Sequence, residues 1–200
     1  MHKLPRDFYD RDTIEVAKDL LGKHLVHVSG GVERVGRIVE VEAYLGPHDL
    51  AAHSAKGLTP RTKPMFGPPG HAYVYLIYGI YHCMNVVTQE EGLAEAVLLR
   101  GAEPLRGIES MRVRRPKAKR DYELMNGPGK ICQALDVDKR LDGESLSGET
   151  LWLTKRDIEV TEDDIAVSPR IGVENAGEAA RWPLRFFLRG NRFVSAYRNV

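Results

Sequence analysis

Residues 37–44 constrain the fold of this chain more than any other segment. They read RIVEVEAY, with apolar and other residues alternating and β-branched residues throughout, and this pattern predicts a β-strand. Because successive side chains of a strand point to opposite faces, the segment has two rows, which are Ile38, Glu40, Glu42 and Tyr44 on one face and Val39, Val41 and Ala43 on the other. Buried carboxylates are costly unless they are paired, so we expect the glutamate face to border a wet cleft.

The end of this strand is the first candidate for an active site. Gly46 and Pro47 end the strand, and the loop after them is expected to bring Asp49 and His53 back toward the same end. Glu42 then has two interpretations, either a general base that activates water or one of two solvated glutamates on an exposed strand face. A lone histidine is more often a hydrogen-bonded structural residue than a catalytic one.

Composition is typical of a soluble globular protein. The 200 residues suit one domain spanning residues 1–200, and shares of 42% hydrophobic and 28% charged residues are ordinary. The first seven residues lack the apolar core of a signal peptide, and no apolar run approaches the length of a membrane span. Cys83 and Cys132 form no CxxC pair, which predicts a cytoplasmic location and argues against a zinc knuckle or a disulfide framework. The net charge is only +1, so a polyanionic partner must bind a local patch.

Periodicity and turn signals predict an ordered series of elements. These are a helix from the capping-box sequence at Asp12 to a stop at Gly22, strands at 25–28 and 35–44 joined as a hairpin around 29–31, and strands at 72–78 and 80–87 joined at Gly79. Then follow a strand at 97–100, a helix beginning at Pro104, a helix entered at Gly127-Pro128, and a hairpin over 184–198 turning at Gly190-Asn191. We therefore predict a single α+β domain with a mixed or largely antiparallel sheet.

The segment between the first strands and the third is a long loop. Residues 45–71 contain five prolines and several glycines. An irregular segment of this length in a compact domain is usually functional or disordered. Its apolar residues, Met65 and Phe66 among them, favour an ordered functional loop.

Tyrosines gather around Gly79. Tyr73 and Tyr75 share a strand face, Tyr44 is placed to oppose them, and the array closes on Tyr81 and Asn85. Two aromatic rings that face each other make a slot for a planar ring, above all a cationic one. Tyr78, beside the glycine of the turn, is expected to project from a tip, where it acts as a wedge. The alternative is a set of ordinary core and edge tyrosines.

Basic residues form the third pattern. The cations that would line one surface and follow a phosphate backbone are Arg61, Lys63, Arg100, the run at 112–120, Lys130, Arg185, Arg189 and Arg192. Any single run is more often solvated charge. Residues 126–130, NGPGK, offer free amides at a helix start with a lysine, which suits a phosphate, although the spacing is not that of a P-loop.

A carboxylate, facing aromatics, a protruding wedge and phosphate-binding cations together describe an enzyme that extrudes a base from DNA. The chain resembles the alkyladenine (3-methyladenine) DNA glycosylase family found in mammals and many bacteria. The resemblance covers almost the whole chain, and its motifs are VEVEAYLGP at 39–47, AAHS at 51–54, YVYLIYGIY at 73–81 with CMN at 83–85, LLR at 98–100, GP and CQAL around 127–135, and PLRF at 183–186.

The resemblance implies a role for each matching residue. Glu42 corresponds to the catalytic glutamate that activates water for attack on the sugar C1′. Tyr44, His53 and Tyr75 correspond to the side chains around the flipped base, and Asn85 to the residue that excludes the 2-amino group of guanine. Tyr78 corresponds to the residue that enters the vacated space in the duplex, and Arg100 to a basic residue near the backbone of the target nucleotide. From their own positions, Ile80, Tyr81, Arg61 and Lys130 are also expected to contact DNA.

The resemblance also implies a fold and a chemistry. The expected fold is mixed α/β, a curved, largely antiparallel sheet with flanking helices and a protruding β-hairpin. The family acts on double-stranded DNA without a metal, and no cofactor is expected. Nothing in the sequence suggests more than a monomer. Val41 stands where mammalian members carry threonine, but its side chain should face away from Glu42. A base methylated on a ring nitrogen is cationic and departs without the second carboxyl group that glycosidases usually need. Deaminated bases such as hypoxanthine are neutral and need a proton donor.

Two other functions remain open from the residues themselves. A metal-dependent hydrolase would use Glu40, Glu42, Asp49 and His53 as ligands. A non-catalytic nucleic-acid-binding module would need only the tyrosines and the basic run. The first would lose activity with a chelator, and in the second Glu42 would be dispensable.

Overall fold

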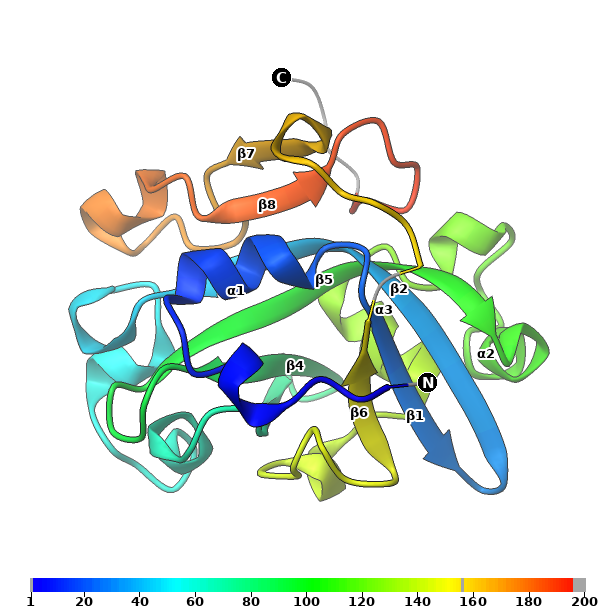
Figure 1. The fold of residues 1–200 in the computed structure, drawn as a ribbon, viewed down its shortest axis with the longest axis horizontal. Helices are drawn as coiled ribbons and strands as arrows, with labels where there is room; N and C mark the ends of the chain where they lie inside the picture. The colour runs from blue at the N-terminus through cyan, green and yellow to red at the C-terminus, as the bar shows by residue number, and fades with distance from the viewer. Residues whose placement is uncertain (1, 156, 196–200) are drawn as a thin grey trace.

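The computed structural model describes residues 2–155 and 157–195, and these form an α+β fold, as predicted (Figure 1). The strands are β1 (His24–Ser29), β2 (Val32–Tyr44), β3 (Ala72–Ile77), β4 (Tyr81–Thr88), β5 (Glu95–Arg106), β6 (Leu151–Thr154), β7 (Ile165–Ser168) and β8 (Arg185–Leu188). The helices are α1 (Thr13–Leu20), α2 (Ile108–Arg114) and α3 (Pro128–Leu135). Short 3-10 turns connect them.

All strand pairs of the sheet are antiparallel, and β2 lies at its centre. The strand order is β3-β4-β5-β2-β1-β6, with β8 pairing with both β2 and β7. One edge of β2 is shared, because β1 pairs with residues 32–37 and β8 pairs with residues 40–42. Both glutamates of the predicted strand therefore stand between β5 on one side and β8 on the other.

Two of the three register shifts in the β2–β5 pair compensate each other. Ile38 pairs with Ala102 and Glu40 with Gly101, so Val39 has no partner on β5. Val41 then pairs with Leu99, which leaves Arg100 as the extra residue on the other strand. Bulges of this kind redirect side chains and are common beside active sites. The strict alternation predicted for this strand is broken at its middle, and Ile38 belongs to the apolar core.

The core is built from the apolar rows of the sheet and from one face of each helix. Asp12 caps α1, since its side chain accepts hydrogen bonds from the backbone N–H groups of Ile14 and Glu15, and Gly22 follows the helix with φ of 82°. In Figure 1 α1 lies in front of β2 and β5, with α3 behind. The buried residues Val16, Ala17 and Leu20 of α1 join Ile131, Cys132 and Leu135 of α3 in a single cluster.

The β3–β4 hairpin protrudes as predicted. At its turn Tyr78 and Gly79 have φ of 53° and 71°, as a type I′ turn requires at both central positions. A tyrosine rarely adopts positive φ, and it costs roughly 1–2 kcal/mol. Tyr78 is nevertheless 83% exposed and the neighbouring Ile80 68% exposed. Strain and an exposed aromatic ring at one turn are typical of a functional residue.

Two predicted elements are wrong. Pro104 lies inside β5 and does not begin a helix; α2 starts at Ile108, after Gly107. β4 pairs with β5 only as far as Leu98, so the missing N–H of Pro104 faces an edge where no described strand pairs with it. The predicted hairpin over 184–198 is also absent, because β8 pairs with β7 and β2 and not with the residues after Gly190. Residues 196–198 of that prediction lie outside the described residues.

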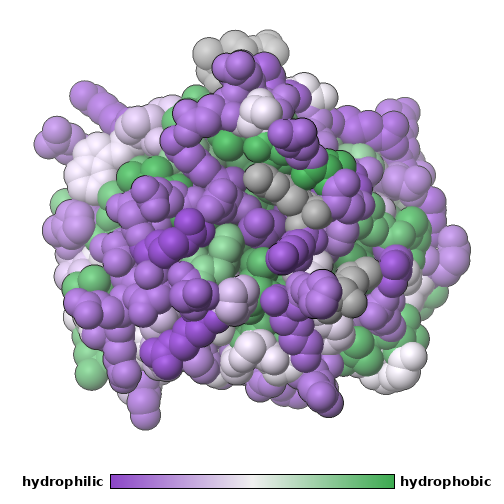
Figure 2. Space-filling view, in the orientation of Figure 1, coloured by the Kyte–Doolittle hydropathy of each residue, from purple (hydrophilic) through white to green (hydrophobic). Residues whose placement is uncertain are grey.

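The face of the molecule seen in Figure 2 has no large continuous hydrophobic patch among the described residues. Hydrophilic residues cover most of this view, and hydrophobic ones appear in small separate groups. Among the described residues, no helix has the length and apolar character needed to span a membrane.

Candidate active site

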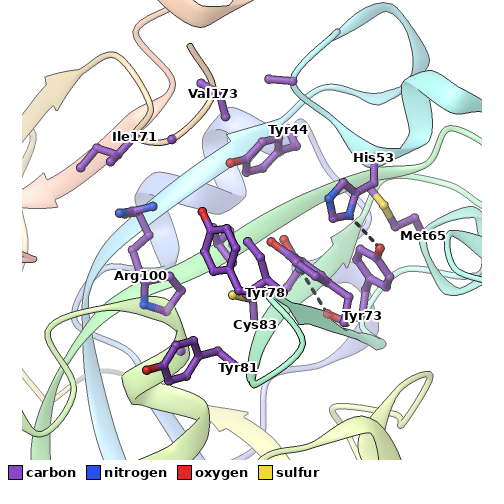
Figure 3. A pocket seen from close by; sticks show the side chains of 18 residues that line it. Tyr44, His53, Met65, Tyr73, Tyr78, Tyr81, Cys83, Arg100, Ile171 and Val173 are labelled. Atoms are coloured by element: carbon purple, nitrogen blue, oxygen red, sulfur yellow. Dashed lines mark hydrogen bonds between the residues drawn. The ribbon is translucent and has the colours of Figure 1, made fainter. Parts of the chain in front are cut away.

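A cavity of about 370 Å³ lies between the open end of the sheet, the 45–71 loop and the start of α3 (Figure 3). It is lined by Tyr44, Ala51, His53, Met65, Tyr73, Tyr75, Ile77, Tyr78, Tyr81, Cys83, Asn85, Leu98, Arg100, Pro128, Gly129, Ile171, Gly172 and Val173. All four residues predicted to bind a base are in this set. The volume is at the lower end of the range for ligand sites.

The register of the sheet explains why these residues meet. Glu42 on β2 pairs with Leu98 on β5, which pairs with Asn85 on β4, which pairs with Tyr73 on β3. Directly paired residues share a face of an antiparallel sheet, so the four side chains form one row. The row runs from the buried carboxylate to the aromatic wall of the cavity.

Glu42 does not itself line the cavity; it has no exposed surface and lies behind Tyr44, Arg100 and Ile171, which do line it. Its Oε1 accepts a hydrogen bond from the backbone N–H of Ile171 at 2.8 Å, and its Oε2 accepts one from the Tyr44 hydroxyl at 2.9 Å. Arg100 Nη1 lies 3.3 Å from Oε1. Burial raises the pKa of Glu42 above its ordinary value, and the three donors oppose that rise without cancelling it. The prediction that this carboxylate faces water is therefore wrong, since Glu42 is fully buried and hydrogen-bonded by protein groups.

Glu40 is equally buried but differs in its surroundings. Its carboxylate accepts hydrogen bonds from Arg185 Nε at 2.7 Å, Arg100 Nε at 3.2 Å, and both the backbone N–H and the hydroxyl of Ser195 at 2.6 and 2.7 Å. Arg100, the bulged residue, thus touches both glutamates. Neither glutamate lines the cavity itself, but of the partners of Glu40 only Arg100 lines it, whereas Tyr44, Arg100 and Ile171, the partners of Glu42, all do. The contacts of Glu40 fit a structural role.

Asp49 is bound by an arginine. Its carboxylate makes a two-pronged ion pair with Arg170, at 2.5 and 2.8 Å, and both side chains have no exposed surface. Arg170 also lies over the ring of Tyr44, 4.7 Å from its centroid. Because Glu40 and Asp49 are engaged by different arginines, the ligand set of the alternative metal site does not come together. Within residues 2–155 and 157–195, no three His, Cys, Asp or Glu side chains are placed to share a metal ion.

His53 contributes to the aromatic wall. Its Nδ1 lies 2.8 Å from the Tyr73 hydroxyl, and its ring is 4.5 Å from that of Tyr75 in an edge-on arrangement (Figure 3). Burial, together with the positive charges of Arg61 and Lys56, lowers the pKa of His53 to about 4. The imidazole is therefore neutral near pH 7 and offers the cavity one nitrogen as a hydrogen-bond donor or acceptor.

Asn85 is held in a fixed orientation at the floor of the cavity. It is 4% exposed, and its Nδ2 donates to the backbone carbonyl of Tyr73 at 3.2 Å. Cys83, paired with Tyr75 across the hairpin, is a neighbour that the sequence did not single out for the cavity. Burial raises the pKa of its thiol, so it is uncharged.

The predicted DNA-contacting residues fall into three groups, which are the hairpin turn, the cations Arg61 and Lys130, and Arg100, which contacts Glu40 and Glu42. Tyr78 and Ile80 lie in the exposed turn of the hairpin beside the cavity, and Tyr81 lies in the first strand pair after it. Arg61 is exposed and lies 5.3 Å from the centroid of Tyr75, at the rim of the cavity. Lys130, at the start of α3, donates to Asn126 Oδ1 at 2.8 Å.

Some cations of the predicted phosphate-binding surface are buried or paired with acidic residues. Arg185 is fully buried against Glu40, because β8 inserts between β7 and β2. In the basic run, Arg112 pairs with Asp121 and Arg114 with Asp136, whereas Lys117, Lys119 and Arg120 are exposed. Only part of this run is therefore available to a phosphate backbone.

No sequence pattern predicted the part of the cavity wall that residues 171–173 form. Ile171, Gly172 and Val173 line the cavity, and the Ile171 N–H reaches Glu42 across 129 positions of sequence. The only sequence signal nearby is the pair Pro169-Arg170 before a glycine, which marks a turn without indicating its partner. Met65 and the Pro128-Gly129 pair complete the cavity from the loop and from α3.

The site thus combines an aromatic slot, a buried carboxylate behind it and an exposed aromatic ring at the tip of the neighbouring hairpin. Comparison with known proteins shows the family of the chain. Residues 7–192 match the family model described as methylpurine-DNA glycosylase. The chain belongs to this family, whose members are hydrolases of N-glycosyl bonds.

Individual relatives match over nearly their full length. A protein of Legionella pneumophila (strain Corby) is 50% identical over 195 residues, covering 98% of this chain and 99% of the relative. One of Alkaliphilus oremlandii is 50% identical, covering 96% and 98%, and one of Methanocella arvoryzae is 49% identical, covering 98% and 96%. All three carry the name "Putative 3-methyladenine DNA glycosylase".

Proposed function

We propose that this chain repairs double-stranded DNA by flipping out alkylated purines, 3-methyladenine in the first place, and hydrolysing their N-glycosidic bond with a water activated by Glu42. The product is an abasic site. The observation that carries the proposal is the position of Glu42. It is a satisfied, fully buried carboxylate whose partners Tyr44, Arg100 and Ile171 all line the cavity.

The cavity wall suits a planar ring with a positive charge. Tyr44, His53 and Tyr75 supply aromatic faces and edges, and burial keeps both tyrosines protonated by raising their pKa values. A desolvated cation over such rings gains about 1–2 kcal/mol. Neutral His53 adds no competing positive charge at pH 7. The slot thus favours N-alkylated purines, which are cationic, over undamaged bases.

Glu42 must be uncovered before it can act. Its Oε2 is capped by the Tyr44 hydroxyl, and no part of the residue reaches solvent. Stacking of Tyr44 on an inserted base draws this hydroxyl away and lets a water take its place at Oε2. The carboxylate then deprotonates the water and stabilises the positive charge that develops on the sugar. Arg100 and the Ile171 N–H continue to hold Oε1.

Deaminated purines are slower substrates in this proposal. A neutral leaving base needs a proton as the bond breaks, whereas a cationic one does not. The residues that line the cavity, within the described ranges, include no aspartate or glutamate. We therefore expect hypoxanthine to be released more slowly than 3-methyladenine in single-turnover assays on defined lesions.

The decisive experiment replaces Glu42 by Gln. This change removes the base but keeps the size of the side chain, so we expect release of 3-methyladenine from methylated DNA to fall by at least about 100-fold, while binding to the duplex is retained. Glu33→Gln, a change at an exposed carboxylate of the same strand, is the matched control and should leave release unchanged. Normal release by the Glu42 variant would refute the mechanism. Loss of wild-type activity in a chelator would favour the metal-dependent hydrolase instead.

A further inference from the structure

We infer that Ser195 is a positioning residue for the active site, and that it acts by holding Glu40 so that Arg100 remains available to Glu42. The inference rests on the proposed function of Glu42. Ser195 lies beyond residues 7–192, which the family model matches. It is 7% exposed, and it does not line the cavity.

Ser195 donates two hydrogen bonds to the same carboxylate, that of Glu40. Its backbone N–H donates to Glu40 Oε2 at 2.6 Å and its hydroxyl donates to Glu40 Oε1 at 2.7 Å, so one residue grips both oxygens. Hydrogen bonds to a charged acceptor are about twice as strong as those between neutral groups. Ser195 therefore supplies two of the four donors on a carboxylate that has no access to water.

The segment that carries Ser195 is fixed against the sheet. Phe193 N–H donates to the Asn191 side chain at 2.9 Å, and Val194 N–H donates to the Asn191 carbonyl at 3.2 Å. Phe193 and Val194 pack on the core. A side chain at position 101 would come within 3.0 Å of the Phe193 carbonyl, so Gly101 is what lets the segment approach Glu40.

Glu40 and Glu42 share one guanidinium. Arg100 presents Nε to Glu40 at 3.2 Å and Nη1 to Glu42 at 3.3 Å. The cluster contains two carboxylates and the two guanidinium groups of Arg100 and Arg185, which balance in charge. When Glu40 is well supplied with other donors, it competes less for Arg100. Removing the Ser195 hydroxyl leaves Glu40 under-satisfied and draws Arg100 toward it and away from Glu42.

The direction of the effect follows from the groups around Glu42. The groups that face it are Tyr44 and Glu40 from β2, Arg100 from β5, the Ile171 N–H, and, farther off, Tyr75 from β3 and Cys83 from β4. Of these, Arg100 is the only one with a positive charge. Weakening it disfavours the charged form of the buried carboxyl, so the acid limb of the reaction should move to higher pH.

The test measures single-turnover release of 3-methyladenine from methylated DNA between pH 5 and 8. We expect Ser195→Ala to raise the midpoint of the acid limb by about half a pH unit, which lowers the rate about three-fold below the midpoint and leaves the plateau nearly unchanged. Ser195→Thr, which keeps the hydroxyl, should restore the wild-type midpoint. Ser110→Ala is the control, because its hydroxyl serves Arg34, outside the cavity.

Three results would overturn the inference. One is an acid limb in Ser195→Ala that overlays the wild type. Another is an equal loss of rate at every pH in Ser195→Ala and Ser110→Ala, which indicates a structural role alone. The third is a failure of Ser195→Thr to restore the midpoint. A wild-type protein that releases no base at any pH would instead refute the proposed function, and is distinguished from these by the missing plateau.

Discussion

Asp49 and Arg170, 121 positions apart in sequence, form a bidentate ion pair from which water is fully excluded. Asp49 also accepts the N–H groups of Leu45 and Ala51, and Arg170 also donates to the carbonyl groups of Ala43 and Ala179. The pair therefore joins the loop that carries His53 to the segment whose Ile171 amide holds Glu42. Two walls of the cavity depend on it.

Breaking this pair should be costly. Arg170→Met leaves the Asp49 carboxylate buried without a counter-charge, and we expect the free energy of unfolding to fall by about 3–5 kcal/mol. The double variant Asp49→Leu with Arg170→Met should recover a substantial part of that loss, since neither charge is then buried alone. Urea denaturation of the wild type, the single variants Arg170→Met and Asp49→Leu, and the double variant completes the cycle. Equal stability of the Arg170 variant and the wild type would show that the pair holds neither wall.

The same pair predicts how stability depends on acid. Burial alone would raise the pKa of Asp49, but Arg170 and the backbone N–H groups outweigh it and hold the pKa below its ordinary value. A depressed carboxyl pKa stabilises the fold above the unfolded value of about 3.9, and that contribution disappears as pH falls through the folded value. Stability of the wild type should therefore decline below about pH 4. Asp49→Asn should decline less steeply there, as measured by urea midpoints at pH 3, 4 and 6.

Tyr78 should affect DNA capture without affecting stability. Its side chain is 83% exposed, so Tyr78→Ala should change the free energy of unfolding by no more than about 0.5 kcal/mol. Loss of one aromatic stacking contact costs about 1–3 kcal/mol, so the flipped state should be about 10-fold less populated. Fluorescence of a base analogue beside the lesion reports flipping. Val113→Ala, at an 80% exposed apolar position on α2, is the control, and equal flipping in the two variants would contradict a wedge role.

His53 predicts a second, distinct pH effect. Burial and nearby cations lower its pKa to about 4 in the folded chain, whereas an unfolded histidine titrates near 6.5. Between these values the unfolded chain binds a proton that the folded chain does not, so stability falls as pH is lowered from about 6.5 to 4. His53→Gln should show a smaller fall over this window. Unfolding midpoints at pH 4.5 and 7 measure the difference, and identical falls would contradict a neutral, buried imidazole.

Gly101 should not tolerate a side chain. A Cβ there would lie 3.0 Å from the Cβ of Glu40 and 3.0 Å from the carbonyl of Phe193, and neither atom is at the free end of a flexible chain. Gly101→Ala should therefore cost about 1–3 kcal/mol of stability through overpacking. Because the displaced groups hold Arg100, base release should also slow. A variant with the wild-type unfolding midpoint and wild-type rate would show that the neighbours move freely.

Glu42, Asn85 and Tyr73 form one row across the sheet, and the strands that carry them could be predicted because each follows a local sequence pattern. Alternation identified the strand of Glu42, and the glycine turn identified the β3–β4 hairpin with Tyr78 at its tip. The α+β class followed from the same turn signals and periodicities. The resemblance then gathered these parts into one site. Their assembly in the structure matches that expectation, although the role of each residue stays a prediction.

The predictions that were wrong or missing share a physical cause, because most of them concern contacts between residues far apart in the sequence. Nothing near Arg185 indicates that it will be buried on Glu40, because the pairing of β8 with β2 depends on the free half-edge that β1 leaves. The Ile171 amide belongs to the backbone and carries no side-chain signature at all. Pro104 was misread because a proline at a helix start and one at an unpaired strand edge look alike in sequence.

The span of sequence between β2 and its donors sets an order of events during synthesis. Glu40 and Glu42 leave the ribosome well before Ile171, Arg185 and Ser195, the groups that later neutralise or orient them. In that interval only Tyr44 and Arg100 can pair with the two carboxylates, so their burial carries an energetic penalty. We therefore expect the centre of the sheet to become buried only after residues 171–195 have been made.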